Sequence, residues 1–238
     1  MTDPNLFRLR VTFCKQGRLV LLSHLEVARA LERAVRRAGL PYAVSNGFSP
    51  HMRIAFGAAL PVGVGGTGEL FDLLMTRYVP PEEALSALRE ASVPDLMPRS
   101  CAYVGPRAPA ASAAYPVSTY RALLSCAPAQ LPVPAEVAVI RKKKEKRLAV
   151  PEFLAGEMRL AGAVLTFSLR AGRSGSLRPD VLLRACCAQA NVADADEGSQ
   201  EPLSLLVDNE EPTLIDERAR DAQEPLRVLS ITRIAQEA

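Results

Sequence analysis

The order of hydrophobic patterns in the first 105 residues restricts the fold more than any other feature of this sequence. The predicted elements are, in chain order, strand 7–14, helix 23–38, strand 53–56, strand 69–79, helix 82–91 and strand 96–104. This β-α-β-β-α-β order is typical of the split βαβ, or ferredoxin-like, arrangement. We therefore predict a chain of the α+β class, with an antiparallel sheet that carries two helices on one face.

The first predicted helix has recognisable signals at both ends. Ser23 is followed three residues later by Glu26, which is the spacing of a capping box, and Gly39 with Pro41 ends the helix. One helix face is apolar and consists of Val27, Leu31, Ala34, Val35 and Ala38. The opposite face carries Glu26 with Arg29, Arg33, Arg36 and Arg37. The helix is therefore predicted to bury one side and to present a basic ridge on the other.

The second half repeats the pattern less regularly. After a Pro/Ala/Ser-rich linker, the predicted elements are strands 118–126, 136–143 and 163–171, helix 179–191, and extended segments 203–207 and 226–234. The linker spans residues 106–114. Three prolines, Pro128, Pro132 and Pro134, crowd the place where a first helix should lie. We therefore predict a first unit over 1–105 and a second, irregular ferredoxin-like unit over 115–238, with acidic loops at 194–202 and 208–225.

The glycine-rich stretch GVGGTG at 63–68 is not a phosphate-binding fingerprint, because no Lys-Ser/Thr pair or helix follows it. We predict a flexible connection between strands there.

Charge is distributed unevenly along the chain. Between Asp194 and Glu224, eleven acidic residues stand against two arginines, so this segment carries −9 and, with a net charge of +3, the remainder carries +12. A basic body favours a polyanionic partner, although a solvated surface with spare arginines explains the same numbers equally well.

Composition disfavours several classes of protein. The five cysteines are scattered and no C-x-x-C occurs, which argues against a disulfide framework and against a metal cluster site. No apolar run reaches the roughly 18 residues that a membrane-spanning helix needs, and the first residues lack the pattern of a signal peptide. We expect a cytoplasmic protein that has no membrane partner.

Both histidines of the chain, His24 and His51, fall within residues 21–57. His24 lies in the first turn of the predicted helix, and His51 follows Pro50 at the start of the next strand, so the two rings could approach each other. Two imidazoles beside a phosphate can serve as base and acid in metal-free RNA cleavage. Alternatively, each ring binds a ligand or an anion, or bonds a backbone carbonyl and braces its turn.

Arginines and small residues supply further candidates for phosphate binding. The ridge of Arg29, Arg33 and Arg36 suits phosphate because guanidinium groups bind it bidentately. Glu26 and Glu32, at helical spacing, would instead neutralise the ridge.

Two turns are also candidates. In the turn Ser45–Pro50, a ligand could approach the backbone at Gly47 and stack on Phe48, although we favour a hairpin or bulge with Phe48 in the core. Arg173 and Arg178 lead into a predicted helix start, which favours an anion unless Asp180 caps that helix. The basic run 141–147 is predicted to form a solvated hairpin arm.

These features combine in one string of residues: Ser23–Glu26, Arg29, Glu32–Ala34, Arg36–Pro41, Ser45 and Gly47–His51. With this string the chain resembles a radical-SAM-associated bacterial domain of unknown function, which occurs alone or fused behind a cobalamin-binding radical-SAM protein. The resemblance is dense over residues 7–80 and returns at 175–180 and 231–233. It implies a radical-SAM protein as partner. Since this chain has no C-x-x-x-C-x-x-C, the iron-sulfur cluster and S-adenosylmethionine are expected only in that partner, and no cofactor or metal in this chain.

Three functions follow as hypotheses. The first is an accessory module that presents tRNA, rRNA or another anionic substrate to a separate radical-SAM enzyme. In it, Arg29, Arg33 and Arg36 bind phosphate while His24, Ser45 and His51 line a small pocket. The second is a metal-independent RNA-processing endonuclease that uses His24 and His51. The third is a protein-interaction scaffold without a ligand pocket.

Overall fold

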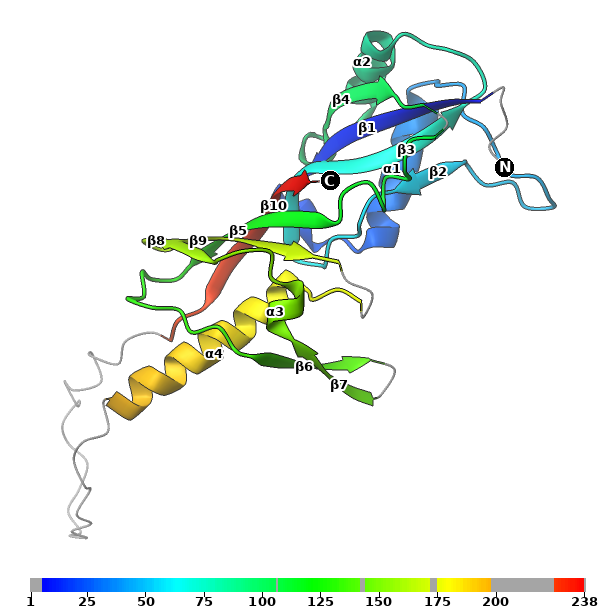
Figure 1. The fold of residues 1–238 in the computed structure, drawn as a ribbon. Coiled ribbons are helices and arrows are strands. Elements are labelled where there is room, and N and C mark those ends of the chain that lie inside the picture. Colours follow the sequence, from blue (N-terminus) through cyan, green and yellow to red (C-terminus); the bar gives the residue numbers. More distant parts are fainter. Residues whose placement is uncertain (1–5, 106, 142–143, 172–174, 198–224, 238) are drawn as a thin grey trace, which may run out of the picture.

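The structure is a computed structural model that describes residues 6–105, 107–141, 144–171, 175–197 and 225–237. The chain forms an elongated molecule in which two units lie end to end along one sheet (Figure 1). The first unit contains β1 (Phe7–Lys15), η1 (Gly17–Leu21), α1 (His24–Arg37), β2 (Ile54–Phe56), β3 (Val64–Met75), α2 (Pro81–Ala91), η2 (Pro94–Leu96) and β4 (Pro98–Tyr103). The α+β class predicted from the sequence is confirmed.

The strand order of the first unit is that of a split βαβ arrangement. β1 pairs antiparallel with β3 on one side and with β4 on the other, and β2 pairs antiparallel with the far edge of β3. The order is therefore β4-β1-β3-β2. In it, α1 connects β1 to β2 across the intervening strand β3, as the order of hydrophobic patterns predicts.

Alternate strand residues build the first core. One face of the sheet packs against both helices, and its centre is formed by Leu9, Val11, Phe71 and Leu73 of the strands with Leu31, Val35 and Leu88 of the helices. Each of these side chains is nearly inaccessible to solvent, and burying one such side chain stabilises the fold by about 1.5–3 kcal/mol.

The segment after β4 covers part of the opposite face. The carboxylate of Asp72 accepts hydrogen bonds from Arg10 at 2.7 and 2.9 Å and from the backbone N–H of Ala111 at 3.3 Å. Arg8 and Arg10 donate in turn to three backbone carbonyls of this segment, those of Gly105, Ala108 and Pro109. The described part of the predicted linker is thus held against the first sheet.

The second unit contains β5 (Val117–Leu124), β6 (Glu136–Arg141), β7 (Lys144–Ala149), α3 (Val150–Phe153), β8 (Arg159–Ala161), β9 (Val164–Arg170), α4 (Pro179–Glu197) and β10 (Val228–Glu237). Its strand order, β10-β5-β9-β8, repeats that of the first unit. The first crossover differs, because a β6–β7 hairpin and the single turn of α3 stand where a long helix would lie. Residues 125–135, which include the three prolines, form no helix.

The two units share one continuous sheet. Three residues at the start of β3 pair in parallel with β10, in the register Ile231 to Val64, Thr232 to Gly65 and Arg233 to Gly66. The prediction of a flexible connection at 63–68 is therefore wrong, because residues 64–68 belong to β3. Glycine is needed here for close approach: a Cβ at Gly66 would collide with the Glu69 carboxylate, and one at Gly65 would lie 3.1 Å from the carbonyl oxygen of Lys15.

Other boundaries also shift. β3 begins at Val64 and ends at Met75, where the sequence predicts 69–79. α4 continues to Glu197, so residues 194–197 are helical and not part of an acidic loop. The predicted extended segment 203–207 and nearly all of the loop 208–225 lie outside the described residues. None of the described helices is long and apolar enough to cross a membrane.

Candidate functional site

The capping box at the start of α1 is confirmed. The Ser23 N–H and the Ser23 hydroxyl both donate to Glu26 Oε2, at 2.8 and 2.7 Å, and the Glu26 N–H donates to Ser23 Oγ at 3.4 Å. The hydrogen bond from the Ser23 side chain lowers the pKa of the Glu26 carboxyl. The Ser23 hydroxyl is therefore engaged in holding the helix end, which agrees with its interpretation as a cap.

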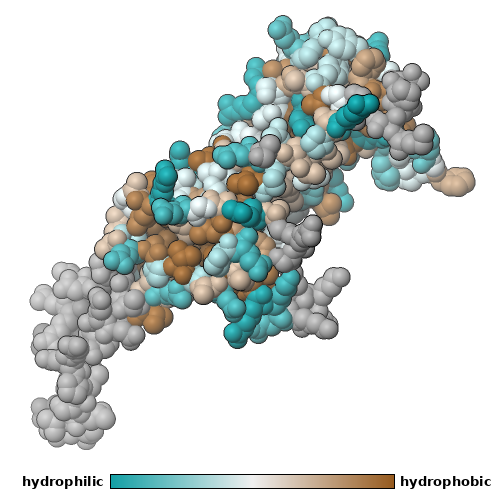
Figure 2. Space-filling model, viewed as in Figure 1, coloured by the Kyte–Doolittle hydropathy of each residue, from teal (hydrophilic) through white to brown (hydrophobic). Residues whose placement is uncertain are grey.

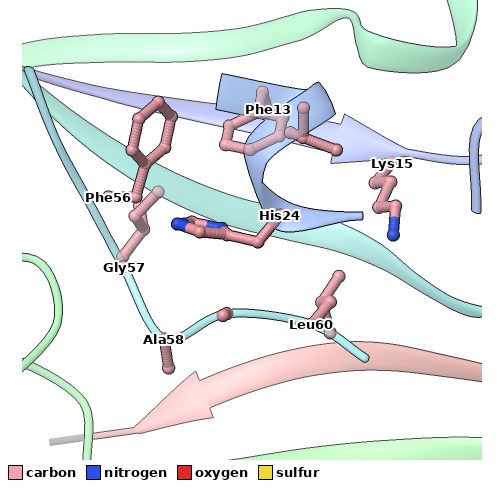
Figure 3. A pocket seen from close by; sticks show the side chains of 10 residues that line it. Phe13, Lys15, His24, Phe56, Gly57, Ala58 and Leu60 are labelled. Atoms are coloured by element: carbon pink, nitrogen blue, oxygen red, sulfur yellow. The ribbon is translucent and has the colours of Figure 1, made fainter. Parts of the chain in front are cut away.

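His24 lines a small hollow between α1, β1 and the segment that follows β2. Its ring lies edge-on to the ring of Phe56, with centroids 5.4 Å apart and planes at 88°. Phe13, Lys15 and Leu60 line the same hollow, and Figure 3 shows His24 directed into it. The hollow measures about 30 Å³, which is enough for a water molecule and too little for a nucleotide.

Lys15 gives this hollow a buried positive group. Its side chain is almost inaccessible to solvent, and its Nζ donates to the carbonyl oxygen of Leu22 at 2.9 Å. Burial lowers the pKa of the Lys15 amine, and the nearby carboxylate of Glu69 acts in the opposite direction. The hollow therefore adjoins a set of buried charged groups at the junction of the two units.

His51 lies on a separate structure, a hairpin over residues 42–53 that we call the finger. Val44 and Met52 pair across it, and the Ser45 N–H donates to the carbonyl oxygen of His51 at 2.8 Å. The His51 N–H donates in return to Ser45 Oγ at 3.0 Å. The structure thus brings Ser45 and His51 together, whereas His51 is not among the residues that line the hollow of His24.

The tip of the finger exposes an aromatic ring. Gly47 has a φ of 125°, a conformation that favours glycine. The next residue, Phe48, is 111% exposed. The prediction that Phe48 lies in the core is therefore wrong, because the turn of the finger leaves its side chain fully exposed and outside every hydrophobic cluster of the described residues.

The basic ridge of α1 is present as predicted. Arg29, Arg33, Arg36 and Arg37 are all exposed, while Val27, Leu31, Ala34 and Val35 are buried on the other side. Arg36 donates to Glu32 at 3.4 Å, and both side chains are accessible to solvent. This exposed ion pair neutralises only part of the ridge, because it engages one of the four guanidinium groups.

A small recess lies beside this ridge, and Ser92 is one of the residues that line it. It lies between the second half of α1 and the end of α2, measures about 70 Å³, and is lined in part by Arg33, Arg37 and Ser92. The Ser92 hydroxyl oxygen is inaccessible to solvent and has no hydrogen-bond partner among the described residues. The other lining residues are apolar, namely Ala30, Leu31, Ala34, Ala91, Val93 and Leu96, so this recess is not a polar site.

The second predicted anion site is neutralised by its own carboxylate. Arg178 donates to both oxygens of Asp180, at 3.0 and 2.8 Å, at the start of α4. Arg173, the other arginine predicted there, lies outside the described residues. The ridge of α1 is therefore the stronger candidate for binding an anion.

Sequence reasoning missed a group of buried charged residues. Arg233 on β10 donates to both oxygens of Glu69 on β3, with the Nε bond at 2.9 Å, and it also donates to the carbonyl oxygen of Ala58 at 2.6 Å. For Arg233, desolvation lowers the pKa, but the hydrogen bond and charge of Glu69 outweigh it and the pKa is raised. The signal in the sequence was the presence of Glu69 and Asp72 within the otherwise apolar strand ELFDLLM.

A family described as "Uncharacterized protein conserved in bacteria (DUF2344)" matches residues 8–179. The chain belongs to this family. The matched region includes the hollow, the finger and the ridge of α1, and it ends at the first residue of α4. No curated protein matches the sequence. Family membership thus fixes a bacterial domain type and assigns it no reaction.

Proposed function

We propose that this protein is a cytoplasmic accessory module that binds RNA through its phosphate backbone and works beside a separate radical-SAM enzyme. One observation carries the RNA part of the proposal. Arg29, Arg33, Arg36 and Arg37 stand exposed on one face of α1, whose opposite face is anchored in the core. A rigid helix that holds arginines at regular intervals is suited to a polyanion, because each side chain is presented without further ordering of the backbone.

Each of the four exposed guanidinium groups on this helix face can bind phosphate oxygens bidentately. These contacts carry no base specificity and set the position of the strand.

The finger supports recognition of unpaired nucleotides. Eleven residue steps separate Phe48 from Arg37, which is at most about 40 Å of chain, so one RNA strand can reach both. A ring that is fully exposed offers both faces to a base, and such stacking contributes about 1–3 kcal/mol per base.

The radical-SAM partner is supported only by the sequence resemblance, which is dense over residues 7–80 and returns at 175–180 and 231–233. In this arrangement the enzyme supplies the cluster and S-adenosylmethionine, and this chain holds the substrate RNA. Recovery of a radical-SAM protein by pull-down from a bacterial host that encodes this chain is the expected result, and recovery of ribosomal proteins only would contradict it.

RNA binding is tested with a labelled single-stranded RNA and fluorescence anisotropy at several salt concentrations. Changing Arg29, Arg33 and Arg36 to Gln should weaken binding about tenfold or more, and should reduce the salt slope by about 0.7 for each phosphate that is no longer neutralised. Phe48→Ala should weaken binding and leave that slope unchanged, because stacking releases no counterions.

A matched control uses three exposed arginines of the second unit, Arg121, Arg159 and Arg170, which change the net charge by the same amount. Equal loss in both triple variants would show that overall charge, and not the ridge, determines binding. The mixtures contain EDTA, so cleavage that His51→Ala abolishes would favour the endonuclease alternative. Absence of binding at low salt would leave the scaffold alternative.

A further inference from the structure

A groove in the second unit lies between the free edge of β6 and α4. It measures about 650 Å³, and its apolar lining includes Val137, Val139, Val181, Ala185 and Ala188. The three helix residues recur at i, i+4 and i+7 and so share one face of α4. Apolar surface gathers over the second unit in the space-filling view, where the first unit is more mixed (Figure 2).

β6 borders the groove with its edge, where its backbone is accessible, as well as with side chains of one face. Four consecutive residues of β6, 136–139, line the groove. Since successive side chains of a strand point to opposite faces, only an edge brings all four to one cavity. The other edge of β6 is paired with β7, and within the described residues β6 and β7 form a two-stranded sheet of their own. The groove-side edge therefore offers unpaired backbone N–H and C=O groups.

Charge indicates what kind of chain this edge accepts. Arg184 lines the groove, is exposed, and makes no ion pair with another described residue. Arg184 is the only arginine of the groove without a carboxylate partner among the described residues, since Arg178 pairs with Asp180. Glu136, the acid in the groove, already lies 3.9 Å from Arg147. The unbalanced charge of the described groove is thus the positive one of Arg184, and the small side chains of Ala185 and Ala188 leave room for apolar groups.

We propose that this groove binds an extended segment of a partner protein, in which apolar residues alternate with acidic ones, as an added strand on β6. Backbone hydrogen bonds to β6 hold the segment, alternate apolar side chains enter the floor of the groove, and an acidic side chain faces Arg184. This site is independent of the RNA-binding ridge on α1, and it gives the second unit a protein partner.

The test uses the full-length protein and a short labelled peptide in which valine alternates with glutamate. Fluorescence anisotropy should show saturable binding, and hydrogen exchange should show new protection of the amides within 136–139 that do not already bond to β7. A peptide with lysine in place of glutamate, and one with N-methyl groups on alternate backbone nitrogens, should both fail to bind.

Two variants locate the site. Arg184→Glu should weaken peptide binding about tenfold, as expected for a reversed interface charge, and Ala188→Trp should abolish it by filling the groove. Arg159→Glu, an exposed arginine of the same unit outside the groove, is the control and should bind as the wild type does. Thermal unfolding checks that each variant is folded.

Three outcomes would overturn the proposal. The first is binding of the lysine or N-methylated peptide with the affinity of the acidic one. The second is peptide binding that survives Ala188→Trp. The third is loss of RNA binding in Arg184→Glu and Ala188→Trp without any effect on the peptide, which would make the groove a nucleic-acid surface.

Discussion

The two units have the same strand order and differ in what crosses over the sheet. In the first unit, α1 is a 14-residue helix that covers the core and leaves a basic ridge outside. In the second unit, the corresponding crossover is a hairpin and the four-residue helix α3, and Phe153 of α3 closes the core with no exposed surface. Strand order therefore survives replacement of a crossover helix, provided that apolar side chains still cover the sheet. Where the helix is missing, a groove opens beside α4.

The other faces of the two sheets differ as well. Asp72 and Arg10 hold the segment after β4 against the first sheet, and this segment covers their charged groups. On the second sheet, the registers place Arg121 and Arg159 on either side of Thr166, and both arginines are exposed. The Asp72 carboxylate of the first sheet is thus paired within the protein, whereas these two arginines of the second sheet face solvent.

The largest expected effect concerns the junction that joins the units. Arg233→Ala leaves the carboxylate of Glu69 buried without its guanidinium partner, which should lower the free energy of unfolding by about 3–5 kcal/mol. Urea unfolding followed by circular dichroism measures this loss. The double change Arg233→Met with Glu69→Gln removes both charges and should cost much less, and an equal cost would contradict a charge-based explanation.

The same variants test whether the two units unfold together or separately. Cys14 in the first unit and Cys186 in the second are both inaccessible to solvent. Burial, and next the neighbouring Cys187, raise the pKa of the Cys186 thiol to about 12, so near neutral pH it reacts only after opening. In the wild type, the two thiols should become reactive at the same urea concentration, because the units unfold together. In Arg233→Ala, each thiol should become reactive at its own urea concentration. Separate reactivity in the wild type would show that the shared sheet does not couple the units.

A smaller effect is expected where the first sheet is covered. Asp72→Asn removes the charge that Arg10 and the Ala111 N–H bind, so it should cost about 1–3 kcal/mol and should speed tryptic cleavage at Arg107. Glu157→Gln, at an exposed carboxylate of the second unit, is the control and should change stability by less than about 0.5 kcal/mol. Unchanged cleavage at Arg107 would mean that Asp72 does not hold the segment.

The smallest effect is expected at the start of α1. Ser23→Ala should cost about 1 kcal/mol, the usual value for removal of a helix cap, whereas Ser23→Asp should retain most of the stability. Because the pKa of Glu26 is lowered in the fold, its stabilising contribution is present at neutral pH and is lost as the pH falls through that lowered pKa. In Ser23→Ala, an NMR titration should find the pKa of Glu26 closer to its ordinary value; an unchanged pKa would exclude the box as its cause.

Local patterns accounted for most elements of the fold. The apolar face of α1, its capping box and the alternation in β1 were all predictable, because they depend on residues only a few positions apart. The three prolines before β6 likewise indicated that the second unit lacks its first helix. In the candidate site, the exposed ridge of Arg29, Arg33, Arg36 and Arg37 followed from helical spacing alone.

Pairings between distant residues escaped sequence reasoning. The glycines at 65 and 66 gave no sign of β10, because their partner lies more than 160 residues away, as it does for the Arg233–Glu69 pair. The exposure of Phe48 was not predictable either, since an aromatic residue in a turn can lie in the core or at the exposed tip of a hairpin.

The sequence by itself determined the order of elements, the capped amphipathic helix and the family, since each depends on periodicity and residue type over short spans. Only the tertiary structure decided that the two units share a sheet, that Glu69 meets Arg233, and that His24 and His51 lie on different structures. The physical reason is that burial of apolar surface tolerates many arrangements. Strand register and buried charge pairs select one of these arrangements, and both depend on contacts between residues that are far apart in the sequence.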